Sequence, residues 1–143
     1  MKKDDITIVR EVQKNAEEAI RAIDTVSGKV YDDGLTMQLA KEMVKFSEVK
    51  NKALSRLAEA KAGAYQAGHF QNLMLEGELH SKTILNTSTS HIAELMIQRS
   101  NKGITELCKV LNHNEDAGKQ SVELAEELIA FEEENIVQLK NYL

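Results

Sequence analysis

The feature that most constrains this chain is the spacing of its apolar residues, which recur in steps of three and four along four separate segments. This spacing puts the apolar side chains on one stripe of an α-helix, and the stripe must be buried against neighbouring helices. The four stripes are Val9, Val12, Ala16, Ala19, Ile23, Val26 and Val30; Leu35, Leu39, Met43, Phe46, Ala53, Leu57, Ala60 and Ala64; Ile92, Met96, Gly103, Leu107 and Val110; and Val122, Ala125, Ile129, Ile136, Leu139 and Leu143.

Clusters of turn-forming residues separate the four segments. Residues 31–34 contain Asp33, which we expect to cap the helix that follows, and residues 112–116 form a second turn. Residues 86–90 are Asn, Thr and Ser, whose short side chains compete for backbone hydrogen bonds and favour a break. The predicted helices are therefore about 5–30, 34–62, 73–112 with a break near 86–90, and 115–142.

The length suits a single domain over residues 1–143, and proline is absent. Four helices of similar length joined by short connections pack against each other in alternating directions. The sequence therefore predicts an all-α fold, an antiparallel up-down-up-down four-helix bundle.

Charge and cysteine content narrow the classes of function. The net charge is -5 and the sequence pI about 5.4, which argues against binding of nucleic acid or anionic lipid. Apolar runs are too short to cross a membrane, the amino end carries no apolar signal segment, and Cys108 has no partner for a disulfide. We expect a cytoplasmic protein in which Cys108 is a small buried residue.

Helical bundles often hold two iron or manganese ions between Glu residues and Glu-x-x-His pairs. Three residues before the four histidines stand Gln66, Gly77, Ser88 and Val110, so the standard pattern is excluded. Motifs for nucleophilic catalysis and phosphate binding are absent as well. The sequence therefore favours no enzyme, no cofactor and no metal.

Two weaker combinations remain, Glu76 with His80 and His91 with Glu94. Each pair could give two ligands to a surface ion, but two ligands alone bind a metal weakly. The favoured interpretation is a solvated helical pair for Glu76 and His80, and an interaction at the start of a helix for His91 and Glu94. If the protein holds a metal, Glu94 and Glu132 are the expected inward ligands, and His91 is a third candidate.

The stripes also bring polar residues inward. The fourth stripe places Glu132 on the face meant for the core, and Arg99 of the preceding segment falls at the same level across the turn near Asn114. A buried carboxylate must be paired or protonated, so an Arg99–Glu132 ion pair is one interpretation. The alternative is that both side chains lie at the edge of the stripe and reach water. Asn135 is a further inward polar candidate.

Charge is unevenly distributed between two of the predicted helices. Residues 34–62 carry many lysines, whereas residues 115–142 carry mainly glutamates. Such faces are usually solvated, but the basic face of one subunit could instead meet the acidic face of another and form an antiparallel dimer.

Several segments carry a resemblance to known proteins. They are Ala22-Ile23-Asp24, Ser88 to Ile97, Gly103 to Leu107, and at the carboxyl end Glu132, Asn135-Ile136 and Leu139 to Leu143. In these segments the chain resembles a group of small uncharacterised bacterial proteins with a ferritin-like four-helix bundle. The resemblance implies a ferritin-like fold and no established activity. Arg99 looks like a departure from the group, because the similar proteins have a small residue at that position.

The function predicted first is a non-catalytic bundle that acts as a structural or protein-interaction module and forms a homo-oligomer, a dimer in the simplest case. The alternative is a divergent ferritin-like carboxylate protein that binds metal or acts as an oxidase without Glu-x-x-His. A small apolar ligand held in the core is a third possibility that the Ala and Met content permits.

Overall fold

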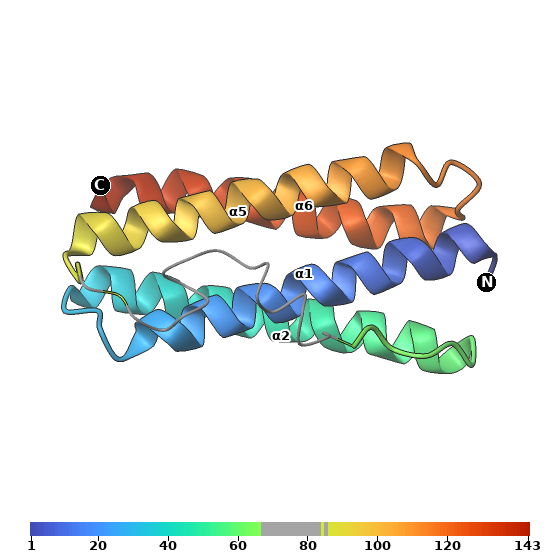
Figure 1. Cartoon of the computed structure of the whole chain (residues 1–143), viewed down its shortest axis with the longest axis horizontal. Coiled ribbons are helices and arrows are strands. Elements are labelled where there is room, and N and C mark those ends of the chain that lie inside the picture. Colours follow the sequence, from blue (N-terminus) through green and yellow to red (C-terminus); the bar gives the residue numbers. More distant parts are fainter. Residues whose placement is uncertain (67–83, 85) are drawn as a thin grey trace.

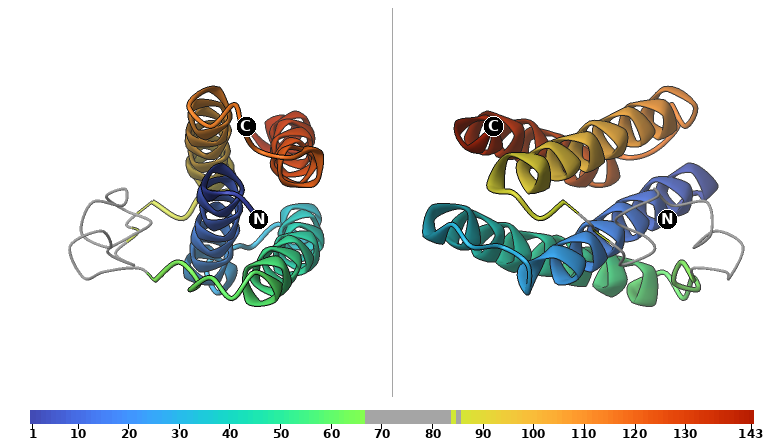
Figure 2. Two further views of the ribbon diagram at one scale, coloured as in Figure 1. Left: turned by 90° about the vertical axis from the view of Figure 1, so that its right-hand side faces the viewer. Right: turned by 60° about the vertical axis from the view of Figure 1, so that its left-hand side comes forward.

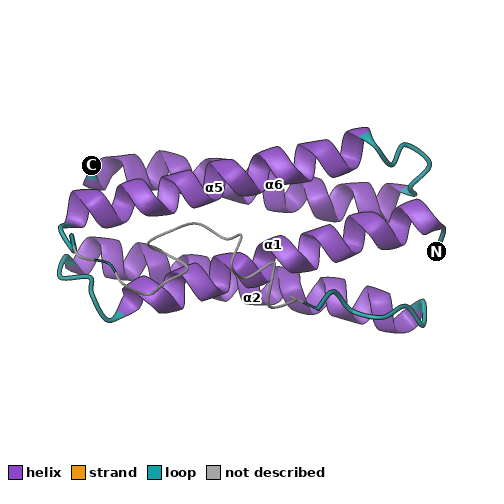
Figure 3. Cartoon of the chain, viewed as in Figure 1, coloured by secondary structure: helices purple, strands orange, loops and turns teal. Residues whose placement is uncertain are grey.

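A computed structural model describes residues 1–66, 84 and 86–143. The described residues form four long helices and no strand (Figure 3). The helices are α1 (Lys3–Ser27), α2 (Asp33–Glu59), α5 (Thr89–Asn112) and α6 (Lys119–Leu139), and a short 3-10 helix, η1 (Lys140–Tyr142), follows α6. None of the described helices is long and apolar enough to cross a membrane.

The helix boundaries follow from local capping. Asp32, rather than the expected Asp33, caps α2, because its carboxylate accepts a hydrogen bond from the Leu35 amide at 2.9 Å. Ser88 caps α5 in the same way by accepting from the His91 amide at 3.2 Å. The third predicted helix therefore begins at Thr89, within the expected break, and its predicted part from 73 to 83 lies outside the described residues.

The helices do not alternate in direction as predicted. Figure 1 shows α1 and α6 running one way along the bundle, and α2 and α5 running the other way. Contacts agree, since Asp5 near the start of α1 accepts hydrogen bonds from the Gly118 amide (2.8 Å) and the Ser121 hydroxyl (2.7 Å) at the start of α6. Gly34 at the start of α2 lies against Tyr142, just beyond the end of α6.

The up-down-up-down order is wrong because it assumed a short connection between the second and third helices. Residues 60–88 separate α2 from α5. At about 3.3 Å per extended residue, this segment can span the length of α2, which is about 40 Å for its 27 residues. The chain therefore returns to the first end of the bundle before α5 begins.

The core lies between the four helices, and α1 packs against each of the other three (Figure 2). The first predicted stripe is buried from Val9 to Val26, and its alanines allow the neighbouring helices to come close. Phe46 of α2 meets Phe131 of α6 edge to face, with ring centroids 5.1 Å apart. In α6, Ala125 and Leu139 of the predicted stripe are buried, together with Leu124 and Leu128, which were not part of it. The other predicted members within α6 are only half-buried: Val122, Ile129 and Ile136.

Candidate functional site

A group of buried polar side chains lies in the middle of the bundle and is the candidate functional site among the described residues. Each of the four long helices contributes to it, and each of these residues is at most 8% exposed. The group, which we call the polar centre, consists of Asn15 of α1, Glu42 of α2, Arg99 and Ser100 of α5, and Glu132 and Asn135 of α6.

An ion pair dominates the polar centre. The Arg99 guanidinium contacts the Glu132 carboxylate through Nη2 and Oε2, and the Ser100 hydroxyl donates a hydrogen bond to Glu132 Oε1 at 3.0 Å. The guanidinium also lies over the Phe46 ring, with Cζ 5.4 Å from the centroid. Both oxygens of Glu132 are thus engaged by neighbouring side chains of the same chain.

Arg99 stays charged in this position. Burial lowers the pKa of Arg99 to about 10, and the negative charge of Glu42 opposes this change. A pKa near that value leaves the guanidinium protonated at neutral pH. The pair therefore consists of a cation and an acidic partner removed from water, and it requires close contact to offset the lost hydration.

Gly103 makes room for the ion pair. A Cβ atom at this position of α5 would lie 2.9 Å from Glu132 Oε2 and 3.4 Å from Asn15 Oδ1. Any larger residue would push the carboxylate away from Arg99. Gly103 therefore lets side chains of α6 and α1 approach the backbone of α5.

Glu42 is the second buried acid of the polar centre. Its side chain accepts a hydrogen bond from Gln38 at 2.9 Å, whereas its Oε1 has no hydrogen-bond partner among the described residues. Burial raises the pKa of Glu42 to about 7, against the opposing effects of Gln38 and Arg99. Glu42 therefore gains or loses its charge near neutral pH.

Other buried atoms of the polar centre also have no hydrogen-bond partner within residues 1–66, 84 and 86–143. These are Asn15 Oδ1, Asn135 Nδ2 and Arg99 Nε, besides Arg99 Nη2 and Glu132 Oε2, which contact each other in the ion pair. Unpartnered buried atoms are uncommon in folded proteins and are the atoms through which a small polar ligand or ion would be held. They are the feature of the polar centre that favours a binding role.

The candidate metal ligands do not come together. Glu132 is buried, but the Glu94 side chain is 56% exposed and lies with His91 on the surface of α5, with 3.6 Å between Glu94 Oε2 and His91 Nδ1. The expectation that Glu94 points inward is wrong because Ile92, Leu95 and Met96 occupy the inward face of that turn. Over the described ranges, no group of three or more His, Cys, Asp or Glu residues is placed to hold a metal ion.

Two further predictions concern the pair of Glu76 with His80 and the burial of Cys108. Glu76 and His80 lie outside the described residues. Cys108 is exposed rather than buried, because the adjacent Leu107 takes the inward position on α5.

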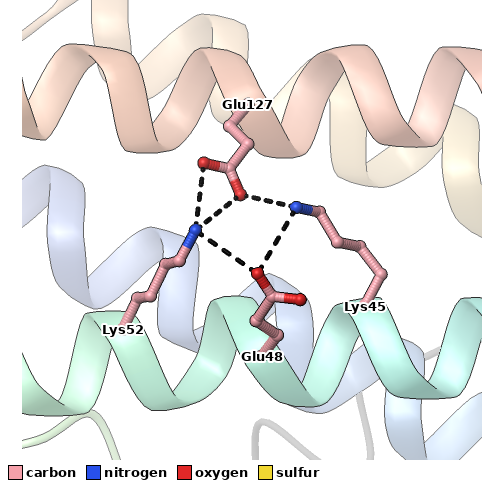
Figure 4. Close-up of polar contacts among 4 residues, drawn as sticks. All are labelled: Lys45, Glu48, Lys52 and Glu127. Atoms are coloured by element: carbon pink, nitrogen blue, oxygen red, sulfur yellow. Dashed lines mark hydrogen bonds and ion pairs between the residues drawn. The ribbon is translucent and has the colours of Figure 1, made fainter.

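An ion-pair network joins α2 to α6 at the surface (Figure 4). Glu127 of α6 lies 2.9 Å from the Lys45 ammonium and 3.3 Å from that of Lys52, and Glu48 completes the network at 3.8 Å from Lys45 and 3.5 Å from Lys52. The hydrogen bond from Lys45 is the main cause that lowers the pKa of Glu127. Part of the basic charge of α2 is therefore balanced within the chain and not by another subunit.

Comparisons with known proteins bear on the fold alone. No protein-family model and no curated protein sequence matches the chain. A solved structure, that of a conserved hypothetical protein from Mycobacterium tuberculosis, is similar with a TM-score of 0.77. The likeness covers 100% of this chain and 99% of that chain at 14% sequence identity. The chain therefore shares an all-helical fold with a bacterial protein that is described as hypothetical.

Sequence reasoning missed Glu42, although a signal was present. The steps from Leu39 to Glu42 to Phe46 to Val49 alternate between three and four, which puts Glu42 on the inward face of α2. The prediction chose the apolar Met43 instead, and Met43 is only half-buried.

Proposed function

We propose that this chain is a non-catalytic four-helix bundle that acts as a structural or protein-interaction module and associates with itself. The observation that carries the proposal is the pairing of Glu132 with Arg99 and Ser100. The acid that a reactive centre would use is engaged by the protein's own cation. The polar centre then holds the helices in register and leaves the outer faces to bind partners.

We further propose that the bundle is ferritin-like and that the protein works in the cytoplasm. In ferritin-like bundles two helix pairs are joined by one long crossover. The directions of α1, α2, α5 and α6, with residues 60–88 between the pairs, support this class. The exposed free thiol of Cys108 suits a reducing compartment.

Light scattering coupled to size-exclusion chromatography tests the proposed self-association. The expected result is a mass above that of one 16.0 kDa chain, which falls on dilution. A mass of one chain at every concentration would contradict self-association.

A divergent carboxylate metal protein is the second candidate, and a specific observation favours it. Glu42 and Glu132 are both buried, from helices that neighbour each other, and Glu42 Oε1 and Asn15 Oδ1 have no hydrogen-bond partner among the described residues. Carboxylate and amide oxygens are suitable ligands for hard divalent cations.

Elemental analysis separates the two candidates. After growth with added iron and manganese, the metal candidate requires a stoichiometric ion in the purified protein that is lost in Glu132→Ala. The module requires wild-type protein and Glu132→Ala with the same negligible metal content. A small apolar ligand in the core stays a prediction, which extraction and mass spectrometry of the purified protein would test.

A further inference from the structure

Most of the large apolar side chains that are exposed lie in one half of the bundle. Of the six such side chains among the described residues, only Met1 lies elsewhere. The other five are 60–82% exposed: Tyr31 lies in the turn between α1 and α2, Met37 and Val44 lie in the first half of α2, and Val137 and Leu143 lie in the last turn of α6 and beyond it. The start of α2 and the end of α6 are both at the left of Figure 1. Exposed apolar side chains gathered in this way indicate an interaction surface.

Two short apolar stripes extend from this end to the middle of the bundle. Met37 and Val44 are seven residues apart, two turns of α2, and therefore point to the same side of that helix. Ala130 and Val137 have the same spacing on α6, and both are exposed. Neighbouring helices α2 and α6 thus each present a stripe to solvent.

The two stripes lie at the same level along the bundle. Gly34 lies against Tyr142, and further along the helices Lys45 and Lys52 both bind Glu127. Because α2 and α6 run in opposite directions, each step forward on α2 corresponds to one step back on α6. Met37 is therefore level with Val137, and Val44 with Ala130, to within one helical turn.

Each stripe carries one charge of opposite sign. Lys41 stands between Met37 and Val44, and Glu134 stands between Ala130 and Val137. Both charged side chains are exposed, and neither forms an ion pair with any residue that the structure describes. In contrast, Lys45, Lys52 and Glu127 are already paired within the chain (Figure 4).

We propose that Met37, Lys41 and Val44 of α2, together with Ala130, Glu134 and Val137 of α6, form a self-docking face that binds a second copy of the chain about a two-fold axis parallel to the bundle. Such an axis puts α2 of one copy opposite α6 of the other. Rotation about it does not shift either copy along the bundle, so residues of α2 and α6 that are level within one chain are also level across the interface. Apolar stripe then meets apolar stripe, and Lys41 meets the partner's Glu134 twice. This inference rests on the proposed self-association and names its surface.

Charge complementarity makes a second copy the occupant. A two-fold interface must be complementary to itself, so each charge needs its opposite at the same level of the same face. Lys41 and Glu134 meet this condition, and the apolar residues around them supply area to bury. A partner of a single charge would match one helix of the face and repel the other.

Charge reversal with a mixing experiment tests the face. In a two-fold dimer, Lys41→Glu alone creates two contacts between acids, and Glu134→Lys alone creates two contacts between lysines. We expect each variant to raise the dimer dissociation constant at least about tenfold in sedimentation equilibrium. An equimolar mixture of the two variants should regain the wild-type mass, because both contacts in the mixed dimer are again between opposite charges.

Matched controls make the same charge changes away from the self-docking face. Lys109→Glu on α5 and Glu115→Lys in the turn after α5 are exposed and should leave the dissociation constant within about twofold of wild type. The double variant Met37→Gln with Val137→Gln removes apolar area from the self-docking face and should also weaken the dimer. Circular dichroism checks that each variant is folded.

The outcomes separate this inference from the broader proposal. A dimer that none of the face variants weakens would overturn the self-docking face and leave self-association standing. Two variants that both weaken the dimer but do not restore it on mixing would overturn the two-fold pairing. A wild-type monomer at all concentrations would overturn the face and self-association together.

Discussion

Arg99 and Glu132 are both buried, and each is the oppositely charged partner of the other in an ion pair. Removing one member of a buried pair leaves an uncompensated charge, which typically costs about 3–5 kcal/mol, whereas replacing both with apolar residues is often nearly neutral. We therefore predict that Arg99→Ala lowers the free energy of unfolding by about 3 kcal/mol or more.

Urea unfolding measures the change in stability, and the matched control is the double variant Arg99→Met with Glu132→Leu. The double variant should be closer to wild type than Arg99→Ala is. If Arg99→Ala lowered the free energy of unfolding by less than about 1 kcal/mol, the buried Glu132 carboxylate would not need Arg99 as its partner.

Glu42 should make stability fall as pH rises toward neutrality. Its pKa is about 7 in the folded protein against a reference value of 4.5, so the folded state binds more protons between these values. The stabilising effect is complete below about pH 4.5 and is lost as pH rises through 7, with a size of roughly 3 kcal/mol.

Replacement of Glu42 by Gln should remove this dependence, because an amide does not titrate. The measurement is the difference in free energy of unfolding between wild type and Glu42→Gln at pH 5, 6, 7 and 8. The free energy of unfolding of Glu42→Gln, relative to that of wild type, should rise at each step up to about pH 7. A constant difference across this range would show that Glu42 titrates as it does in water.

At the scale of the element, α2 ends with a left-handed residue that is not glycine. Lys61 has φ of 55°, and the backbone bonds from Ala62 to Leu57 (2.9 Å) and from Lys61 to Ala58 (3.0 Å) close the helix in the Schellman arrangement. Glycine adopts this conformation without steric cost, so Lys61→Gly should stabilise the protein by about 1 kcal/mol.

Gly28 is the opposite case, a glycine at a position where its conformational freedom is not needed. It follows α1 with φ of -78°, and a Cβ there would meet nothing within 4 Å. Gly28→Ala should therefore be tolerated or stabilising by about 0.5 kcal/mol. Thermal unfolding of both variants compares the two effects, and a lower melting temperature for Lys61→Gly would contradict the assignment.

The elements were largely predictable, because each depends on local spacing and capping. The stripe from Val9 to Val26 located α1, and the level of Arg99 with Glu132 followed from the short turn between α5 and α6. Glu94 was misplaced because a polar residue beside an apolar stripe is assigned to one side or the other by a single step of the helix. Buried Glu42 was missed because an apolar neighbour competed for its place.

At the scale of the whole molecule, the order of directions could not be obtained from the stripes. A stripe shows which face of a helix is buried but not which way the helix runs, and the direction of α5 depends on how far residues 60–88 travel. The up-down-up-down order followed from the predicted helix beginning at 73, which shortened this connection. Reversing one pair of helices changes no stripe, so the two topologies share nearly the same sequence pattern.

Spin labels distinguish the two topologies directly. With Cys108 replaced by Ser, labels at Tyr31 and Leu143 should lie within about 20–25 Å, the width of a bundle of helices packed about 10 Å apart. Labels at Met1 and Tyr31 should be separated by about 40 Å, the length of α1. An up-down-up-down bundle would instead place Leu143 near Met1 and far from Tyr31.

The central claim is that Glu132, the buried acid that pairs with Arg99, does not hold a metal. Anything that binds the folded state alone raises its stability, so thermal unfolding with and without a large excess of Mn²⁺ or Fe²⁺ is the most direct test. The prediction is a melting temperature that these ions leave unchanged in wild type and in Glu132→Gln alike. A rise in the wild-type melting temperature that disappears in Glu132→Gln would contradict the claim.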